Sequence, residues 1–301
     1  MKKILQVNLV ITLFVTICLL SSCANSNDDY KIISEKELKD KIAGGWAGKM
    51  IGVMYGEESE FKARSVIYEK DLPWEPDMIK GALGQDDLYV QMSFMMTMDE
   101  YGMDAPAEKF AESFANAGYR LWHANRKARK NYWDGIMPPE SGSPKYSMHA
   151  DDIDFQIEAD YIGFMCPGMP QTSNKICDKI GHIMNYGDGV YGGMFVCALY
   201  TSAYFEKDIN KILESALKAI PAESEYALCI RDVIAGYERN PKDWRKTWQE
   251  LEDKWGSVDI CGAMDPFNID AKINGAYIVM GLLYGEGDFH KTMEVSTRCG
   301  Q

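Results

Sequence analysis

Apolar residues return every three or four positions along most of this 301-residue chain, which is the spacing that gives an α-helix one buried face. Period-two alternation bounded by turn pairs, the pattern of a β-strand, is scarce. The pattern predicts helices over residues 34–56, 86–101, 106–130, 151–164, 171–185, 188–205, 209–220, 223–237, 241–255, 268–283 and 288–297. We therefore predict an all-α protein.

The first predicted helix, residues 34–56, has a clear start and an unusual interior. Ser34 and Glu37 have the spacing of a capping box, in which each side chain hydrogen-bonds the other residue's backbone. Glycines recur at every fourth position of this helix: Gly44, Gly48, Gly52 and Gly56. Such glycines share one face and let another helix approach closely, so we predict tight helix packing there. Lys49 and the short apolar length exclude a membrane-helix dimer with the same spacing.

Residues 127–144 are rich in charge, proline and glycine and interrupt the helical pattern. Tyr132, Trp133 and Ile136 give this segment apolar surface to bury. We therefore predict a long ordered loop, of the kind that often flanks a binding site. The sequence contains no internal repeat and no clear interdomain linker, so we predict one domain over residues 34–301.

The N-terminus has the pattern of an export signal. Lys2 and Lys3 precede an apolar run, and Leu-Ser-Ser stands directly before Cys23. This resembles a bacterial lipoprotein signal, which predicts a signal peptide over residues 1–22, a lipidated Cys23 as the only membrane attachment, and a flexible tether over residues 23–33. The acidic residues of the tether resemble export signals of surface lipoproteins, so we expect the outer membrane, with exposure at its surface. An uncleaved membrane anchor with a chance cysteine is the alternative.

The formal net charge is −13, and no basic stripe with interleaved aromatic residues offsets it. Such a surface repels phosphate backbones, so we expect no nucleic-acid partner, while small phosphorylated ligands stay open. The cysteines after Cys23 are irregularly spaced in apolar stretches, which favours buried free thiols over disulfides. They are Cys166, Cys177, Cys197, Cys229, Cys261 and Cys299. The histidines show no zinc-site spacing, and we interpret His123 and His182 as ordinary structural or surface residues.

Two adjacent carboxylates, Asp86 and Asp87, stand at the head of an apolar helix. One is enough to cap the helix and to interact with its dipole. The second repels the first unless a cation lies between them, and hard divalent cations prefer carboxylate oxygens. The pair therefore indicates a metal site, provided that other motifs support it.

Such motifs are present. A glycine-rich helix ends in Gly52-Val-Met-Tyr-Gly56 and is followed by Glu60-Phe61, and Gly84-Gln-Asp-Asp-Leu88 opens the next helix. A helix of small residues occupies 188–205, and the chain ends in Thr297-Arg-Cys-Gly-Gln301. In this order the motifs resemble those of the ADP-ribosylglycohydrolase family, which includes the dinitrogenase reductase-activating glycohydrolases. The resemblance covers residues 36–301.

The resemblance implies a compact orthogonal bundle of α-helices with a central cleft for two magnesium ions, or manganese in some members. It carries over Glu60, Gln85, Asp86 and Asp87 as metal-site residues, with Gln85 in place of a threonine. Glu60 and Asp87 are the catalytic candidates, because a carboxylate accepts the proton of the attacking water while the ions polarise the ribose hydroxyls. Which carboxylate is the base stays open, and positioning the leaving group is an alternative role for Glu60.

The chain departs from the family pattern at three positions: Val53 replaces an aspartate, and Gln85 and Leu88 replace threonines. These changes bear on the ADP-ribosyl substrate more than on the metal, because a glutamine carbonyl still offers an oxygen. Two aspartates of the last family motif would fall just beyond Gln301. The resemblance thus predicts a fragment, truncated at its C-terminus, with half of its metal site, weak metal binding and little or no activity.

A second acidic cluster lies in the predicted helix 151–164. Asp151, Asp154 and Glu158 share one helix face, which favours a solvated face with Asp151 as the N-cap. The alternative is that Asp151, Asp152 or Asp154 enters the cleft as a substrate contact or an acid.

Two aromatic features have competing interpretations. Tyr186 and Asp188 either form a plain helix start, capped by Asp188, or contact the substrate. Trp244, Trp248 and Trp255 recur at helical spacing, which indicates core packing rather than a platform for sugars.

We predict a metal-dependent glycohydrolase that cleaves an N- or O-glycosidic bond to an ADP-ribosyl or ribofuranosyl-like group outside the cytoplasm. Its substrate would be a small molecule or a glycan. Two alternatives remain: a metal-independent inverting glycosidase that uses residues 151–158, and a non-catalytic, carbohydrate-binding surface lipoprotein. The sequence leaves open the substrate, the bond type, the base and the oligomeric state.

Overall fold

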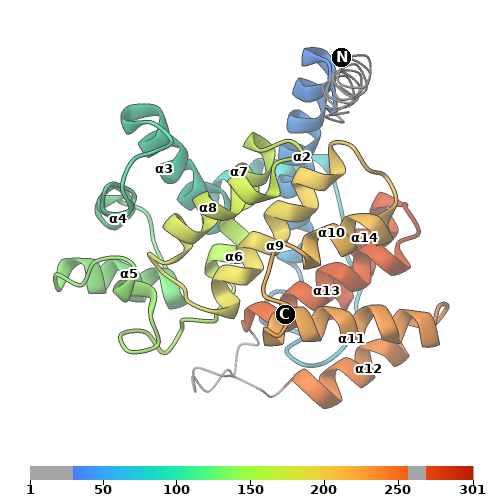
Figure 1. Cartoon of the computed structure of the whole chain (residues 1–301). Coiled ribbons are helices and arrows are strands. Elements are labelled where there is room, and N and C mark those ends of the chain that lie inside the picture. Colours follow the sequence, from blue (N-terminus) through green and yellow to red (C-terminus); the bar gives the residue numbers. More distant parts are fainter. Residues whose placement is uncertain (1–29, 257–268, 301) are drawn as a thin grey trace, which may run out of the picture. The chain divides into compact units, whose positions relative to one another are not determined.

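The computed structural model describes residues 30–256 and 269–300 (Figure 1). The predicted signal peptide, Cys23 with most of the tether, and Cys261 lie outside the described residues. The chain divides into a short unit, residues 1–34, and a large unit, residues 35–301, which carries every described helix.

The large unit is built from α-helices and two 3₁₀ helices. In chain order these are α2 (Glu35–Gly56), η1 (Pro76–Gly84), α3 (Asp86–Tyr101), α4 (Ala107–Asn116), α5 (His123–Trp133), η2 (Glu140–Gly142), α6 (Asp154–Glu158), α7 (Asp160–Met165), α8 (Pro170–Gly181), α9 (Asp188–Ala203), α10 (Ile209–Leu217), α11 (Glu225–Arg239), α12 (Trp244–Trp255), α13 (Ala271–Tyr284) and α14 (Phe289–Arg298). Residues 30–256 and 269–300 contain no β-strand, only an isolated bridge between Asp152 and Asp270. The all-α prediction is confirmed.

Most helices begin and end close to their predicted bounds, and α3 covers residues 86–101 in full. The start of α2 directly after Ser34 also follows the prediction. Side chains at the N-caps explain several other starts, because their oxygens accept first-turn N–H groups that have no partner within the helix. These caps are Asp208, Ser224, Asp243, Asp270 and Asp288.

The prediction of one helix over residues 106–130 is wrong, because the chain leaves the helical path between α4 and α5. Arg129 stabilises this break: its guanidinium donates to the carbonyls of Tyr119 at 2.7 Å and Ala117 at 3.0 Å. Helix α5 runs to Trp133, so the loop predicted over residues 127–144 begins only after that residue. Trp133 itself is exposed instead of buried.

The predicted helix 151–164 is also interrupted, and Asp151 is not its N-cap. Residues 151–153 pair with residues 269–271 instead: the N–H of Ala271 donates to Asp151 O at 2.9 Å, and that of Ile153 donates to Ile269 O at 2.9 Å. Two short helices, α6 and α7, follow this pairing. A tertiary contact with a distant segment has therefore overridden the local helical pattern.

Helix α9 packs against α6, α7, α8, α10 and α13, and most of its residues are buried (Figure 1). Its small residues make the close approach of α6 possible. A Cβ atom at Gly193 would lie 2.4 Å from the Phe155 ring, and one at Gly192 would lie 2.5 Å from Gln156 Oε1. This packing holds α6 in the position from which it reaches the cavity described below.

The glycine face of α2 does not pack as predicted. Cβ atoms at Gly44, Gly48, Gly52 and Gly56 would meet no atom of another described element within 4 Å. It is Gly45 that touches another element, since a Cβ there would lie 2.5 Å from the Phe164 ring. The recurring glycines therefore leave open space beside the helix.

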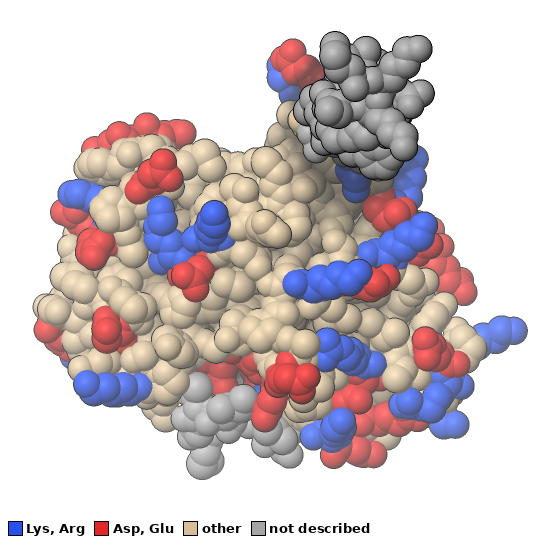
Figure 2. All heavy atoms as spheres, viewed as in Figure 1, with Lys and Arg blue, Asp and Glu red and all other residues tan. Residues whose placement is uncertain are grey.

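The cysteines of the described residues and the tryptophans of α12 pack as the sequence predicts. Cys166, Cys177, Cys197, Cys229 and Cys299 are buried free thiols, as predicted. Trp248 and Trp255 belong to the core, and Trp244 packs against it. On the face shown in Figure 2, acidic and basic side chains are interspersed over several elements. No helix within the described residues has the length and apolar character needed to cross a membrane.

We expect Gly193→Ala to lower the free energy of unfolding. The added Cβ would lie 2.4 Å from the Phe155 ring, and such overpacking costs about 1–3 kcal/mol, which outweighs a gain of about 0.5–1 kcal/mol in helix propensity. Gly44→Ala is the matched control, because open space surrounds that position and only the propensity gain remains. Chemical denaturation should give midpoints shifted in opposite directions; equal midpoints would contradict the packing.

Candidate active site

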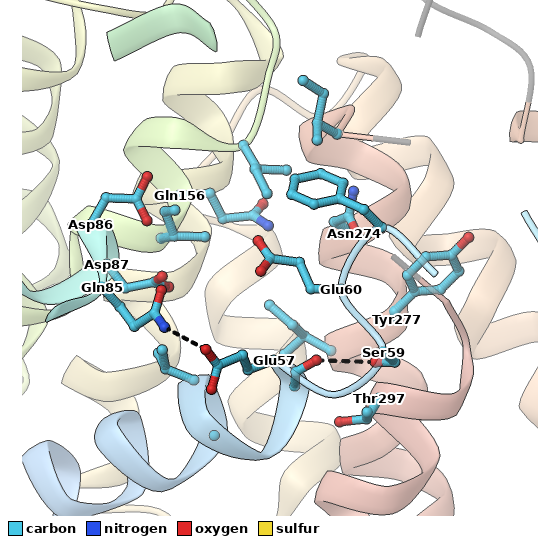
Figure 3. Close-up of a pocket in the computed structure, with 18 of the residues that line it drawn as sticks. Glu57, Ser59, Glu60, Gln85, Asp86, Asp87, Gln156, Asn274, Tyr277 and Thr297 are labelled. Carbon is cyan, nitrogen blue, oxygen red and sulfur yellow. Dashed lines mark hydrogen bonds between the residues drawn. The ribbon is translucent and has the colours of Figure 1, made fainter. Parts of the chain in front are cut away.

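A cavity of about 730 Å³ opens where several helices meet. Its walls are the end of α2 with the loop that follows, the starts of α3 and α5, α6, one face of α13 and the end of α14. Figure 3 shows acidic side chains on one side of this space and Asn274 and Tyr277 of α13 on the other. The size suits a small-molecule ligand.

The carboxylates carried over from the sequence motifs meet in this cavity. Glu60, Asp86 and Asp87 all line it, and Glu60 points across the space toward the two aspartates (Figure 3). Leu88 and the fully buried Val90 anchor the first turns of α3, which fixes Asp86 and Asp87 at the cavity wall. The structure therefore brings together residues that the sequence separates by a loop and a 3₁₀ helix.

These carboxyl groups destabilise one another's charged forms. Burial, followed by repulsion from Asp87 and Asp86, raises the pKa of Glu60 to about 7. Burial and repulsion from Asp87 raise the pKa of Asp86 to about 6. The pKa of Asp87 is raised as well, mainly by burial. Such a set of like charges is a place where a bound cation would be stabilised.

Lys49 of α2 neutralises part of this charge. Its ammonium lies 2.8 Å from Asp160 and 3.6 Å from Asp87, and it donates to the carbonyl of Ile157. Burial alone would lower the pKa of Lys49, but Asp160 and Asp87 outweigh burial and raise it. The ammonium thus stays charged, and it holds Asp87 while leaving Asp86 without a close cation among the described residues.

The face of Asp151, Asp154 and Glu158 is not solvated, which corrects the favoured prediction: all three side chains are buried. Asp154 lines the cavity and accepts the backbone N–H of Asn125 at 3.0 Å. Burial raises its pKa to about 7, with a further contribution from Asp86. Burial, followed by repulsion from Asp154, raises the pKa of Glu158 well above its usual range.

The other predicted site residues have different surroundings. Gln85 lines the cavity, but its amide nitrogen donates to Glu57 at 3.2 Å (Figure 3). Asp151, Tyr186 and Asp188 are not among the lining residues. The Asp188 carboxylate accepts the backbone N–H of Tyr226 at 3.0 Å, whereas Tyr186 is exposed and packs on His182.

Several lining residues were missed by reasoning from the sequence. Glu57 lies three positions before Glu60, and its charge could have drawn attention to it. Trp122, Gln156, Asn274, Tyr277 and Ser296 reach the cavity from distant segments and carry no local signal. The contribution of Thr297 places the last segment with family-like sequence at the same cavity.

The comparison with protein families shows which family the chain belongs to. Residues 34–301 match the family model described as ADP-ribosylglycohydrolase. The chain belongs to the ADP-ribosylglycohydrolase family. No curated protein and no solved structure matches it. Membership makes the chain a hydrolase of a metal-dependent family with a small-molecule substrate.

The cavity fits a metal ion by its chemistry. Glu60, Asp86 and Asp87 offer several carboxylate oxygens, which are the ligands that hard divalent cations prefer. The pKa values of Glu60 and Asp86 are raised because burial and neighbouring carboxylates destabilise their charged forms, and positive charge would offset this. A dication would supply it.

A second group also has the composition of a metal site. His123, His149 and Asp152 each offer one ligand atom, and these atoms lie within 4.8 Å of one another. His123 therefore has close polar neighbours, and its interpretation as an ordinary structural or surface residue stays a prediction. Sequence spacing did not reveal the group, because the helix that begins at His123 and the loop at residues 149–152 meet only in the folded chain.

We expect Glu60→Gln to raise the melting temperature at pH 8 and to leave it unchanged at pH 4. A carboxyl whose pKa rises from about 4.3 in the unfolded chain to about 7 in the folded protein contributes stability at low pH. The parent protein loses that contribution as the pH rises through 7, because Glu60 then ionises inside the cavity. Glutamine cannot ionise, so the variant does not lose this stability at pH 8.

Asp77→Asn is the control for this measurement, since Asp77 is an exposed carboxylate that pairs with Lys80 at 2.7 Å. It should produce no gain at pH 8. A Glu60→Gln protein that melts like the parent at both pH values would contradict the raised pKa.

Proposed function

We propose that the chain is a metal-dependent glycohydrolase that cleaves an N- or O-glycosidic bond to an ADP-ribosyl or ribofuranosyl-like group outside the cytoplasm. The observation that carries this proposal is the meeting of Glu60, Asp86 and Asp87 on one cavity of about 730 Å³. Family membership supports the hydrolase class.

Magnesium is the proposed metal, because the available donors are hard oxygen atoms. Asp86, Asp87 and Glu60 would hold it, with the amide oxygen of Gln85 as a further ligand. When bound, such ions polarise substrate hydroxyls, orient a water molecule and stabilise developing charge. Asp87 also pairs with the Lys49 ammonium, which lies 3.6 Å from it.

Two carboxyl groups of the cavity can move protons near neutral pH. Glu60 lies in the cavity and its carboxylate can take a proton from an attacking water; without a bound ion its pKa is raised to about 7. Asp154, whose pKa is also raised to about 7, can hold a proton for the departing group. The Asn125 N–H fixes the Asp154 carboxylate in place.

The alternative of a metal-independent glycosidase built on residues 151–158 has weaker support. An inverting glycosidase needs two carboxyl groups on opposite sides of the bond that is cleaved. Of Asp151, Asp154 and Glu158, only Asp154 lines the cavity. A carbohydrate-binding protein without activity is distinguished from both enzymes by the experiment below.

We expect the full-length protein to release ribose from ribosides or ADP-ribosyl conjugates in the presence of Mg²⁺, and EDTA to abolish this activity. Asp87→Asn should lower kcat by at least about 100-fold, which is the usual scale for loss of an essential proton-transfer or charge-stabilising group. Measurement of free sugar tests this expectation, with Asp77→Asn as the surface control.

Two other results of this assay would point to different functions. Activity that survives EDTA but is lost in Asp154→Asn would overturn the metal-dependent mechanism in favour of the second enzyme. Saturable sugar binding without turnover would overturn both enzymatic proposals.

The proposed location is the outer membrane, through a lipid on Cys23. It is supported by the basic and apolar start of the sequence and by the Leu-Ser-Ser-Cys segment. We expect the protein to fractionate with membranes and to incorporate labelled fatty acid, and Cys23→Ser to lose both properties. Labelled, membrane-bound Cys23→Ser protein would overturn the assignment.

A further inference from the structure

Two histidines and an aspartate converge on one point at the edge of the cavity. The Nδ1 atom of His149 lies 2.8 Å from Asp152 Oδ2, and that of His123 lies 3.8 Å from the same oxygen. The two imidazole rings stand nearly perpendicular, at 81°, with centroids 5.5 Å apart. We propose that His123, His149 and Asp152 bind a first-row transition-metal dication of the zinc class, at a site separate from the carboxylates Glu60, Asp86 and Asp87.

The donor set favours zinc over magnesium. Two imidazole nitrogens and one carboxylate oxygen suit Zn²⁺ and its neighbours in the first transition row. Magnesium prefers oxygen ligands and gives up its water reluctantly, which directs it to the other carboxylates. The two groups of ligands therefore select different ions.

Burial differs among the three ligands in a way that leaves one side open. The Asp152 side chain is 4 % exposed, whereas those of His123 and His149 are 24 % and 27 % exposed. The carboxylate thus forms the floor of the site and the imidazoles its accessible rim. An ion held there would keep coordination positions for water or for an anionic group of a ligand.

The loop that carries two of the ligands is held rigidly. The buried side chain of Asn185 donates from Nδ2 to the carbonyls of Ala150 at 3.0 Å and Asp152 at 2.8 Å, with a longer contact of 3.4 Å to His149. The backbone N–H of Tyr186 donates to the same Ala150 carbonyl at 2.7 Å. Metal sites depend on such supporting contacts, because these fix the ligands before the ion arrives.

The third ligand sits on a strained backbone. His123 has φ of 35°, in the left-handed region that residues other than glycine rarely adopt. Strain of this kind persists where the surrounding structure requires a particular side chain, and it is concentrated at functional sites. Here it directs an imidazole toward Asp152 and His149 at the first position of α5.

The site lies between two hollows. His123 lines the carboxylate cavity and also a second pocket of about 770 Å³, which His149 lines as well. Arg126, Lys127 and Lys145 are among the residues of that pocket. Their positive charge disfavours a bare dication and favours one that carries an anionic co-ligand on its open side, so the ion would link the two hollows.

Zinc binding to the intact protein tests the proposal. After removal of metal and chelator, we expect one Zn²⁺ per chain with a micromolar or tighter Kd in competition with a chromophoric chelator, and resistance to excess Mg²⁺. Co²⁺ should give visible absorption bands typical of imidazole ligation. His149→Ala and His123→Gln should each weaken zinc binding by at least about 10-fold.

Two controls separate this site from the proposed hydrolase site. His290→Gln changes a histidine that packs on Tyr55, and Asp86→Asn changes the carboxylate cavity; both should bind zinc like the parent. If His149→Ala does not fold, the isosteric Asp152→Asn, together with His123→Gln, gives the same information.

Absence of zinc binding in the parent, or parent-like affinity in the histidine variants, would overturn the proposal. So would an equal loss in Asp86→Asn, because the ion would then sit among the carboxylates. These readouts need no enzymatic activity, so they stand or fall independently of the glycohydrolase proposal.

Discussion

The arrangement around the cavity depends on one buried ammonium group. Lys49 extends from α2 to Asp87 of α3, to Asp160 of α7 and to the carbonyl of Ile157 in α6. It therefore joins four helices at the point where carboxylates repel one another. Removing one member of a buried ion pair leaves an uncompensated charge, which is far more costly than losing a surface pair. Lys49 thus ties Asp87, on the cavity wall, to the short helices α6 and α7.

The helices themselves were largely predictable, because each one depends on a local pattern. Helix α3 follows its predicted bounds in full, since its apolar spacing agrees with its burial. The errors occur where distant groups compete with the local pattern. Arg129 binds carbonyls at the break after α4, and residues 151–153 pair with residues 269–271 in place of a helical turn. Neither partner can be identified from spacing along the chain.

The site was predictable only in part, and for the same reason. Glu60, Asp86 and Asp87 belong to short motifs that follow one another in the family's order, so the sequence indicates them together. Burial of Asp154 depends on the packing of α6 against α9, and the helical spacing alone suggested a solvated surface. The histidine cluster combines a helix start with a distant loop and has no pattern that a linear reading would detect.

The open glycine face of α2 has a consequence for the range of molecules that the cavity admits. Gly52 and Gly56 form part of its wall and leave room where side chains would otherwise project. Relatives could narrow or reshape this part of the cavity by placing an alanine, serine or larger residue at either position. The carboxyl groups of Glu60, Asp86 and Asp87 would be untouched, so selectivity could diverge while the reaction stayed the same.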